Sequence, residues 1–173
     1  GEARLFWHPY TPKPESLSAS GTYRYLWHAM QPAISLMVYA DDNMTQAPIF
    51  AARDYISDWL ERSFFNSDPD TKYTWYDHGT AERLMAFLMM HEIGRQQGFD
   101  YRFMARLNHA IVKHAQLLES EVFYSSHQPT RYHNHAWFQD MALIATAAAI
   151  PNLPCAGRWL QRALDRLGDQ LIN

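Results

Sequence analysis

Apolar side chains recur every three or four residues along most of the chain, which is the spacing of one face of an α-helix. Six stretches follow this pattern, and residues that start or stop helices bound each of them. They predict helices over residues 22–39, 47–65, 80–97, 101–120, 137–150 and 157–171. No alternating strand pattern of useful length interrupts them. The sequence therefore predicts an all-α fold.

Prolines and one glycine mark several of these helix boundaries. Pro32 predicts a bend in the first helix, and Pro48 falls in the first turn of the second helix, where its missing N–H costs little. Gly98 can supply a left-handed C-cap to the third helix, and Pro151 ends the fifth helix. The fifth helix is almost wholly apolar, so we expect it to be buried on most sides, whereas the charged face of the sixth is typical of an outer helix.

Short connections between the predicted helices favour antiparallel neighbours and therefore three hairpins. Weak internal similarity indicates a repeat, because the residues at 76–78 precede the third helix and the similar residues at 132–135 precede the fifth. Repeated hairpins fit an α-solenoid, or part of an incomplete α/α toroid, better than a closed four-helix bundle. At this length, residues 1–173 are expected to form a single helical domain.

Composition narrows the classes of function. Hydrophobic residues make up 47% of the chain and charged residues 19%, which is typical of a folded protein. With 15 Lys+Arg against 18 Asp+Glu, the net charge of −3 offers no positive field to phosphates, so no nucleic-acid partner is expected. No apolar run approaches the roughly 20 residues that span a bilayer, so no membrane span is expected. The single Cys155 excludes an intrachain disulfide.

Two polar clusters open the third and fifth predicted helices. If successive hairpins are antiparallel, these two helices run parallel and their N-terminal ends share one rim. The clusters consist of Trp75, Tyr76, Asp77, His78 and Arg83, and of Tyr132, His133, Asn134, His135, Trp137 and Gln139. Helix N-termini favour anions, and aromatic rings beside His, Asn and Arg side chains suit a sugar. The pattern predicts an acidic carbohydrate ligand.

The stretch WYDHGTAERL at residues 75–84, followed later by His133, Asn134 and His135 opening an apolar helix, resembles the helical toroid of heparinase II/III-like polysaccharide lyases. Members cleave uronate-containing polymers, such as heparan sulfate or alginate, by β-elimination. The resemblance implies that Asn134 and His135 are catalytic, neutralising the uronate carboxylate, with no metal or other cofactor. It implies that the substrate-binding residues are Trp75, Tyr76, His78, Arg83, Tyr132, His133 and Trp137.

The resemblance covers most of the chain and implies parts outside it. It implies that residues 1–173 are a fragment of the toroid domain of a longer, periplasmic or secreted lyase whose toroid is followed by a C-terminal β-sandwich domain. The general base and acid, among them a catalytic Tyr, are expected beyond Asn173. The isolated chain is therefore expected to be inactive. Nothing in the sequence selects one uronate polymer.

Other interpretations of the polar residues stay open. His133 and His135 could bind a metal together with His78 or Asp77. Asn134 could act as a helix N-cap, which is compatible with substrate contact.

Two further classes of protein also stay open. Arg83 could instead pair with Glu82 or Asp77 on the surface. A non-catalytic helical-repeat scaffold that binds a protein or carbohydrate partner would use its Tyr and Trp side chains as interface anchors. A glycoside hydrolase would need two carboxylic acids across a cleft, and Asp77 and Asp140 are the only candidates near the rim. We expect Asp140 to point elsewhere.

Several other chemically distinctive side chains are interpreted as packing residues. They are Trp27, Trp59 and Trp159, the helical histidines His91, His109 and His114, and the group Met85, Met89 and Met90.

Overall fold

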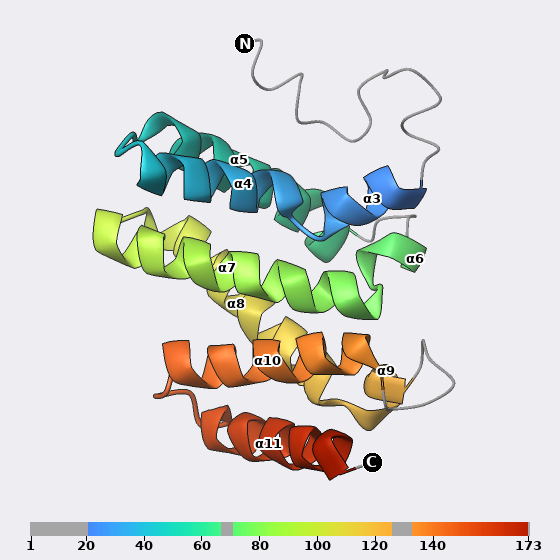
Figure 1. Ribbon diagram of the computed structural model, residues 1–173. Helices are drawn as coiled ribbons and strands as arrows, with labels where there is room; N and C mark the ends of the chain where they lie inside the picture. The colour runs from blue at the N-terminus through green and yellow to red at the C-terminus, as the bar shows by residue number, and fades with distance from the viewer. Residues whose placement is uncertain (1–20, 67–70, 126–132, 173) are drawn as a thin grey trace.

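The computed structural model describes residues 21–66, 71–125 and 133–172, and all regular structure within them is helical, which confirms the all-α prediction (Figure 1). The helices in chain order are α3 (Gly21–His28), α4 (Gln31–Asp42), α5 (Ala47–Trp59), the π-helix η1 (Leu60–Phe65), α6 (Thr71–Thr74), α7 (Asp77–Gln97), α8 (Tyr101–Glu119), α9 (Glu121–Ser125), α10 (Asn134–Ala149) and α11 (Ala156–Ile172). None of these helices combines the length and the apolar character needed to cross a membrane.

The long helices form three stacked hairpins, in which α4 pairs with α5, α7 with α8, and α10 with α11 (Figure 1). Helix α7 lies in the middle of the stack and contacts both α4 and α10. Helices α4, α7 and α10 run in the same direction, and α3, α6 and α9 lie near their N-terminal ends (Figure 1). The hairpin order and the parallel course of α7 and α10 agree with the prediction. Closure into a toroid stays a prediction.

The first predicted helix is two helices in the structure. Helix α3 ends at His28, and α4 begins at Gln31 with Pro32 in its first turn. Met30 lies between them with a φ of 64°, in the left-handed region that few non-glycine residues adopt, and its side chain is fully buried. The bend predicted at Pro32 is therefore a complete break two residues earlier, which the burial of Met30 in the core stabilises.

Other helix boundaries follow local rules. Gly98 takes a φ of 68° and caps the C-terminus of α7 in the left-handed conformation, as predicted. Asp100 caps α8 by accepting a hydrogen bond from the backbone N–H of Phe103 at 3.0 Å. Trp27, Trp59 and Trp159 are buried, which confirms them as core residues.

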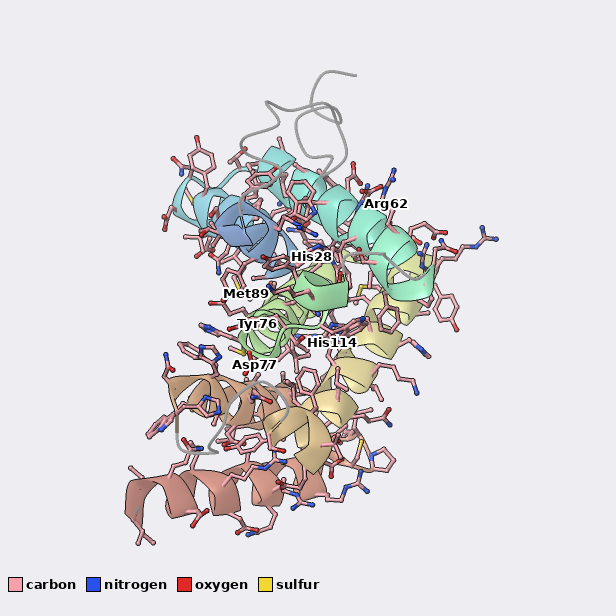
Figure 2. The ribbon with its side chains drawn as sticks, turned by 90° about the vertical axis from the view of Figure 1, so that its right-hand side faces the viewer. His28, Arg62, Tyr76, Asp77, Met89 and His114 are labelled. Atoms are coloured by element: carbon pink, nitrogen blue, oxygen red, sulfur yellow. The ribbon has the colours of Figure 1, made fainter. Side chains whose placement is uncertain are left out.

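Arg83 lies inside the core, and its predicted role in substrate binding is wrong. Its side chain is fully buried, and its Nε donates a hydrogen bond to Nε2 of His114 at 2.9 Å. Its other two nitrogens donate to the backbone carbonyls of His28 and Thr74 at 2.6 and 2.7 Å. The guanidinium also lies over the Trp59 ring, 4.3 Å from its centroid. Arg83 therefore ties α3, α6 and α8 to α7 and is not available to a ligand. Figure 2 labels two of its partners, His28 and His114.

His114 is the neutral partner of this buried arginine, which confirms it as a packing residue. Its Nδ1 donates to the carbonyl of Ala110 at 2.7 Å, which leaves Nε2 to accept from Arg83. Burial, reinforced by the positive charge of Arg83, holds the pKa of His114 well below its usual value of 6.5. Folded protein therefore binds fewer protons than unfolded protein below that pH.

We expect the free energy of unfolding to fall as the pH drops below the unfolded histidine pKa of 6.5. One proton taken up on unfolding contributes a slope of at most about 1.4 kcal/mol per pH unit. Urea unfolding at a series of pH values measures this slope, and His114→Gln, whose side chain is neutral, should flatten it. The matched control His109→Gln removes an exposed histidine of the same helix and should leave it unchanged. An equal slope in wild type and His114→Gln would contradict the assignment.

Helix α10 is less buried than its apolar sequence predicts. Trp137, Phe138 and Met141 are 42%, 44% and 50% exposed, because α10 packs against α7, α8 and α11 on only part of its circumference. Met85 and Met89 of α7 are also exposed, so their prediction as core side chains is wrong, whereas Met90 is buried as predicted. Part of the apolar surface of α7 and α10 therefore faces outward among the described residues.

Candidate functional site

The N-terminal ends of α7 and α10 lie side by side and bring the two predicted polar clusters together. The rings of His78 on α7 and His135 on α10 have centroids 5.0 Å apart. Figure 2 views the molecule from this side and shows Tyr76 and Asp77 where α7 begins, with Asp77 toward α10. The prediction that His78 and His135 open parallel helices at one rim is confirmed.

The first pair at this rim joins His135 to Asp77. Nδ1 of His135 lies 3.2 Å from each carboxylate oxygen of Asp77. The Asp77 side chain is fully buried, whereas that of His135 is 18% exposed. Asp77 also accepts a hydrogen bond from the backbone N–H of His78 at 2.7 Å. Because a carboxylate only accepts, Nδ1 of His135 carries a proton, and Asp77 fixes both the tautomer and the orientation of the ring.

A second carboxylate–imidazole pair lies beside the first. Nε2 of His78 is 3.4 Å from Oε1 of Glu82, one helical turn along α7, and both side chains are about one-fifth exposed. Tyr25 from α3 donates a hydrogen bond to the other Glu82 oxygen at 2.8 Å, and burial together with Glu82 raises the pKa of this phenol. Phe138 of α10 stacks on the His78 ring with centroids 4.0 Å apart. Burial lowers the pKa of His78, so its imidazole is neutral at pH 7.

Some buried polar atoms at this rim have no hydrogen-bond partner. In the described part of the chain, such atoms are Nε2 of His78, both ring nitrogens of His133, the side-chain amide of Gln139 and Oδ1 of Asp140. Oδ1 of Asp140 lies away from the rim, 3.6 Å from Arg166 of α11, so the atoms that the rim leaves unsatisfied are those of His78 and His133. Leaving one such group unsatisfied costs about 1–3 kcal/mol. Such atoms are uncommon in folded proteins, and their concentration here indicates a place where a ligand or water completes the hydrogen bonding.

Aromatic and imidazole rings pack around His135. Tyr76 meets its ring edge-on at 5.7 Å, and His133 lies 5.5 Å away between centroids. Burial, aided by His135, lowers the pKa of His133, which therefore stays neutral at pH 7.

Asn134 is the first residue of α10 and its side chain is exposed. The N-cap position belongs to His133, whose side chain makes no capping hydrogen bond, so the interpretation of Asn134 as the N-cap is wrong. The exposed amide is next to His135 in sequence.

The other predicted binding residues divide between rim and interior. Trp137 is exposed on α10, close to the rim. Trp75 is half-buried and packs against core rings, with its centroid 6.5 Å from that of Trp59 and 5.3 Å from that of His114. Its proposed stacking on a sugar therefore depends on the part of the ring that stays open. Tyr132 lies outside the described residues.

The described side chains bear on two of the alternatives, a metal site and a glycoside hydrolase. No cluster of three or more His, Cys, Asp or Glu side chains in residues 21–66, 71–125 and 133–172 is arranged to hold a metal. Asp140 accepts hydrogen bonds from Tyr124 of α9 at 2.8 Å and from Gln170 of α11 at 3.2 Å, so it points away from the rim, as expected. Burial raises its pKa to about 6. Asp77 therefore has no second acid facing it from Asp140, as a glycoside hydrolase would require.

Sequence reasoning placed Asp77 at the rim but missed its pairing with His135. Glu82 was considered only as a partner of Arg83. Tyr25 lies in the first predicted helix and was not among the candidate site residues. The four-residue spacing of His78 and Glu82 is a local signal that could have found their pairing. The contact of Asp77 with His135 and that of Tyr25 with Glu82 join residues 58 and 57 positions apart, which no local pattern encodes.

Comparison with known protein families, with curated proteins and with solved structures finds no match for this chain. The fold and the site together define an all-α protein of stacked helical hairpins with two histidine–carboxylate pairs at one rim. The resemblance to heparinase II/III-like lyases rests on the sequence motifs alone.

Proposed function

We propose that this chain is the helical part of a polysaccharide lyase that cleaves uronate-containing acidic polysaccharides, of the heparan sulfate or alginate kind, by β-elimination. Asn134 and His135 neutralise the uronate carboxylate. The observation that carries the proposal is the Asp77–His135 pair, in which a fully buried carboxylate holds a partly exposed imidazole at a rim of two helix N-termini.

The chemistry explains why these residue types are needed. Removal of the weakly acidic C5 proton leaves an enolate-like anion spread onto the carboxylate, and the C4=C5 double bond forms as the C4–O4 bond breaks. Donors and positive charge aimed at the carboxylate stabilise this anion in the transition state. The exposed amide of Asn134 can donate a hydrogen bond, and the imidazole of His135, oriented by the carboxylate of Asp77, is the second group proposed to meet the anion.

The N-terminal ends of α7 and α10 add positive electrostatic potential at the rim. Each N-terminus acts as roughly half a positive charge and presents backbone N–H groups. Among the described residues, His133 makes no side-chain capping hydrogen bond to the first turn of α10. Trp137, exposed in the first turn, offers an apolar face on which a sugar ring can stack.

The proposed lyase includes parts outside these residues. A β-sandwich domain of the same protein follows the helical part. A tyrosine outside the chain protonates the departing O4. The proposal also gives the protein a periplasmic or secreted location, where such polymers are met.

We expect the 173-residue chain alone to bind uronate oligosaccharides weakly, through their carboxylates, and to release no unsaturated product. Tyr76 stands at the start of α7, edge-on to His135, rather than across a cleft where it could reach O4. NMR titration of the labelled chain with an alginate oligosaccharide should shift the side-chain signals of Asn134 and His135. The methyl ester of the same oligosaccharide, which lacks the charge, is the control.

Two outcomes would contradict this expectation. Equal shifts with the acid and the ester would show that the carboxylate is not recognised. Abundant unsaturated product from the isolated chain would show that a phenol or imidazole inside it protonates O4.

A non-catalytic scaffold is the second candidate function, favoured by the exposed apolar side chains Met85, Met89, Phe138 and Met141. Such a scaffold, with its partner surface elsewhere, would tolerate the joint loss of Asn134 and His135, which the lyase would not.

A further inference from the structure

We propose that His78 is the general base that removes the C5 proton, with Glu82 holding its imidazole in the reactive tautomer. This inference rests on the proposed function, because it names the base for the same uronate site. It places the base inside this chain, contrary to the expectation from the resemblance. The structural basis is the second carboxylate–imidazole pair, which lies directly beside the Asp77–His135 pair.

The two histidines have different surroundings and therefore suit different tasks. Both oxygens of the fully buried Asp77 face Nδ1 of His135, so this ring is held as a hydrogen-bond donor to Asp77 and is not placed to act as the base through Nδ1. Only one oxygen of Glu82 faces His78. The other oxygen accepts a hydrogen bond from the Tyr25 phenol and lies 3.4 Å from the Gln31 amide. The attraction of Glu82 for a proton on His78 is therefore weaker, and burial lowers the pKa of that imidazole. A neutral imidazole has the lone pair that a base needs.

The proximity of Glu82 indicates which nitrogen is basic, although Nε2 of His78 makes no hydrogen bond in this structure. Nε2 of His78 lies 3.4 Å from Oε1 of Glu82, and the neighbouring carboxylate favours the proton on this nitrogen. The lone pair is then on Nδ1. The present contact is longer than a good hydrogen bond, but catalytic hydrogen bonds in ligand-free proteins are often long and tighten when substrate binds. Phe138, stacked at 4.0 Å, and Tyr25, whose ring centroid is 5.8 Å away, hold the ring in place.

The spacing of the two imidazoles fits a single uronate residue. Their centroids are 5.0 Å apart, and both side chains are nearly one-fifth exposed. In a uronate, the carboxyl carbon is bonded directly to C5. A carboxylate anchored at His135 therefore brings the C5 proton close to the neighbouring imidazole of His78.

The proposed step balances in protons and electrons. Nδ1 of His78 takes the C5 proton, and the electron pair of the C5–H bond becomes the C4=C5 double bond. The C4–O4 bond breaks, and O4 takes a proton from the acid outside this chain. His78 then returns its proton to water.

Hydrogen exchange at C5 tests this base without requiring the acid. In D2O, a base that removes the C5 proton replaces it with deuterium even where elimination cannot finish. We expect the 173-residue chain to exchange H5 of a saturated alginate or heparan oligosaccharide, followed by ¹H NMR. His78→Gln should slow the exchange by about 10²-fold or more without weakening binding. The matched control His91→Gln removes a histidine from the same helix, about 20 Å further along it. It should change neither the exchange rate nor binding.

Glu82→Gln separates a positioning role from a structural one. Exchange in the wild type should rise with pH through the pKa of His78 and then level off. The charged and titratable groups around His78 are Tyr25 from α3, Tyr76, Asp77 and Glu82 at the start of α7, and His135 from α10. Among these, Glu82 is the largest influence raising the pKa of His78. Glu82→Gln should therefore move the rising limb to lower pH and reduce the plateau.

The outcomes distinguish this inference from the proposed function. Loss of exchange in His78→Gln with binding retained supports both. Binding with full exchange in His78→Gln, or binding without exchange in the wild type, overturns His78 as the base and leaves carboxylate recognition standing. Absence of binding overturns the proposed function and this inference with it.

Discussion

Replacing Asn134 or His135 with alanine in the full-length protein should lower kcat by about 10²–10³-fold in each case, with modest effects on substrate affinity. Both residues open α10 beside the buried carboxylate of Asp77, and the anion that they stabilise develops mainly in the transition state. The absorbance of the unsaturated uronate product measures the rate.

Asn108→Ala is the matched control, because Asn108 is an exposed amide on α8 whose described hydrogen bond is to His91, away from the rim. It should leave kcat unchanged. Near-normal turnover in both rim variants would rule out the carboxylate-neutralising role. Loss of activity with a chelator would instead favour the metal interpretation.

Arg83→Met should be strongly destabilising, by about 3–5 kcal/mol. The change leaves the carbonyls of His28 and Thr74, and Nε2 of His114, buried without their donor. It also removes the contact of the guanidinium with the Trp59 ring. Urea unfolding followed by circular dichroism measures the loss.

Arg95→Met is the control for Arg83, because Arg95 is exposed near the C-terminal end of the same helix. Its replacement should leave the unfolding midpoint almost unchanged. Equal midpoints for the two variants would show that the buried network does not stabilise the fold. Since Arg83 also ties α3 and α6 to α7, its loss should loosen the helix that carries Tyr25.

The sequence was sufficient for the helices and for the meeting of the two clusters. Periodicity located the long helices, and the short connections gave the hairpin order that brings His78 and His135 together. The sequence pattern did not predict features that depend on tertiary contacts. The break at Met30 depends on burial of its side chain, and the exposure of Met141 depends on how much of α10 its neighbours cover.

The candidate site was predicted in position but not in detail. Polar residues before a helix mark a rim whether they point outward or inward, so the pattern could not show that Arg83 is buried. The partners of the two histidines decide their chemistry. Of these, only Glu82 is a local neighbour on the helix, whereas Asp77 reaches His135 through the packing of α7 against α10.

Product formation by the full-length protein tests the central claim most directly. The protein should be incubated with heparan sulfate and alginate and with the same polymers after reduction of their carboxyl groups. We expect unsaturated uronate product from at least one native polymer and none from its carboxyl-reduced form. Absence of product from every uronate polymer, or equal cleavage of the native and reduced forms, would contradict this claim.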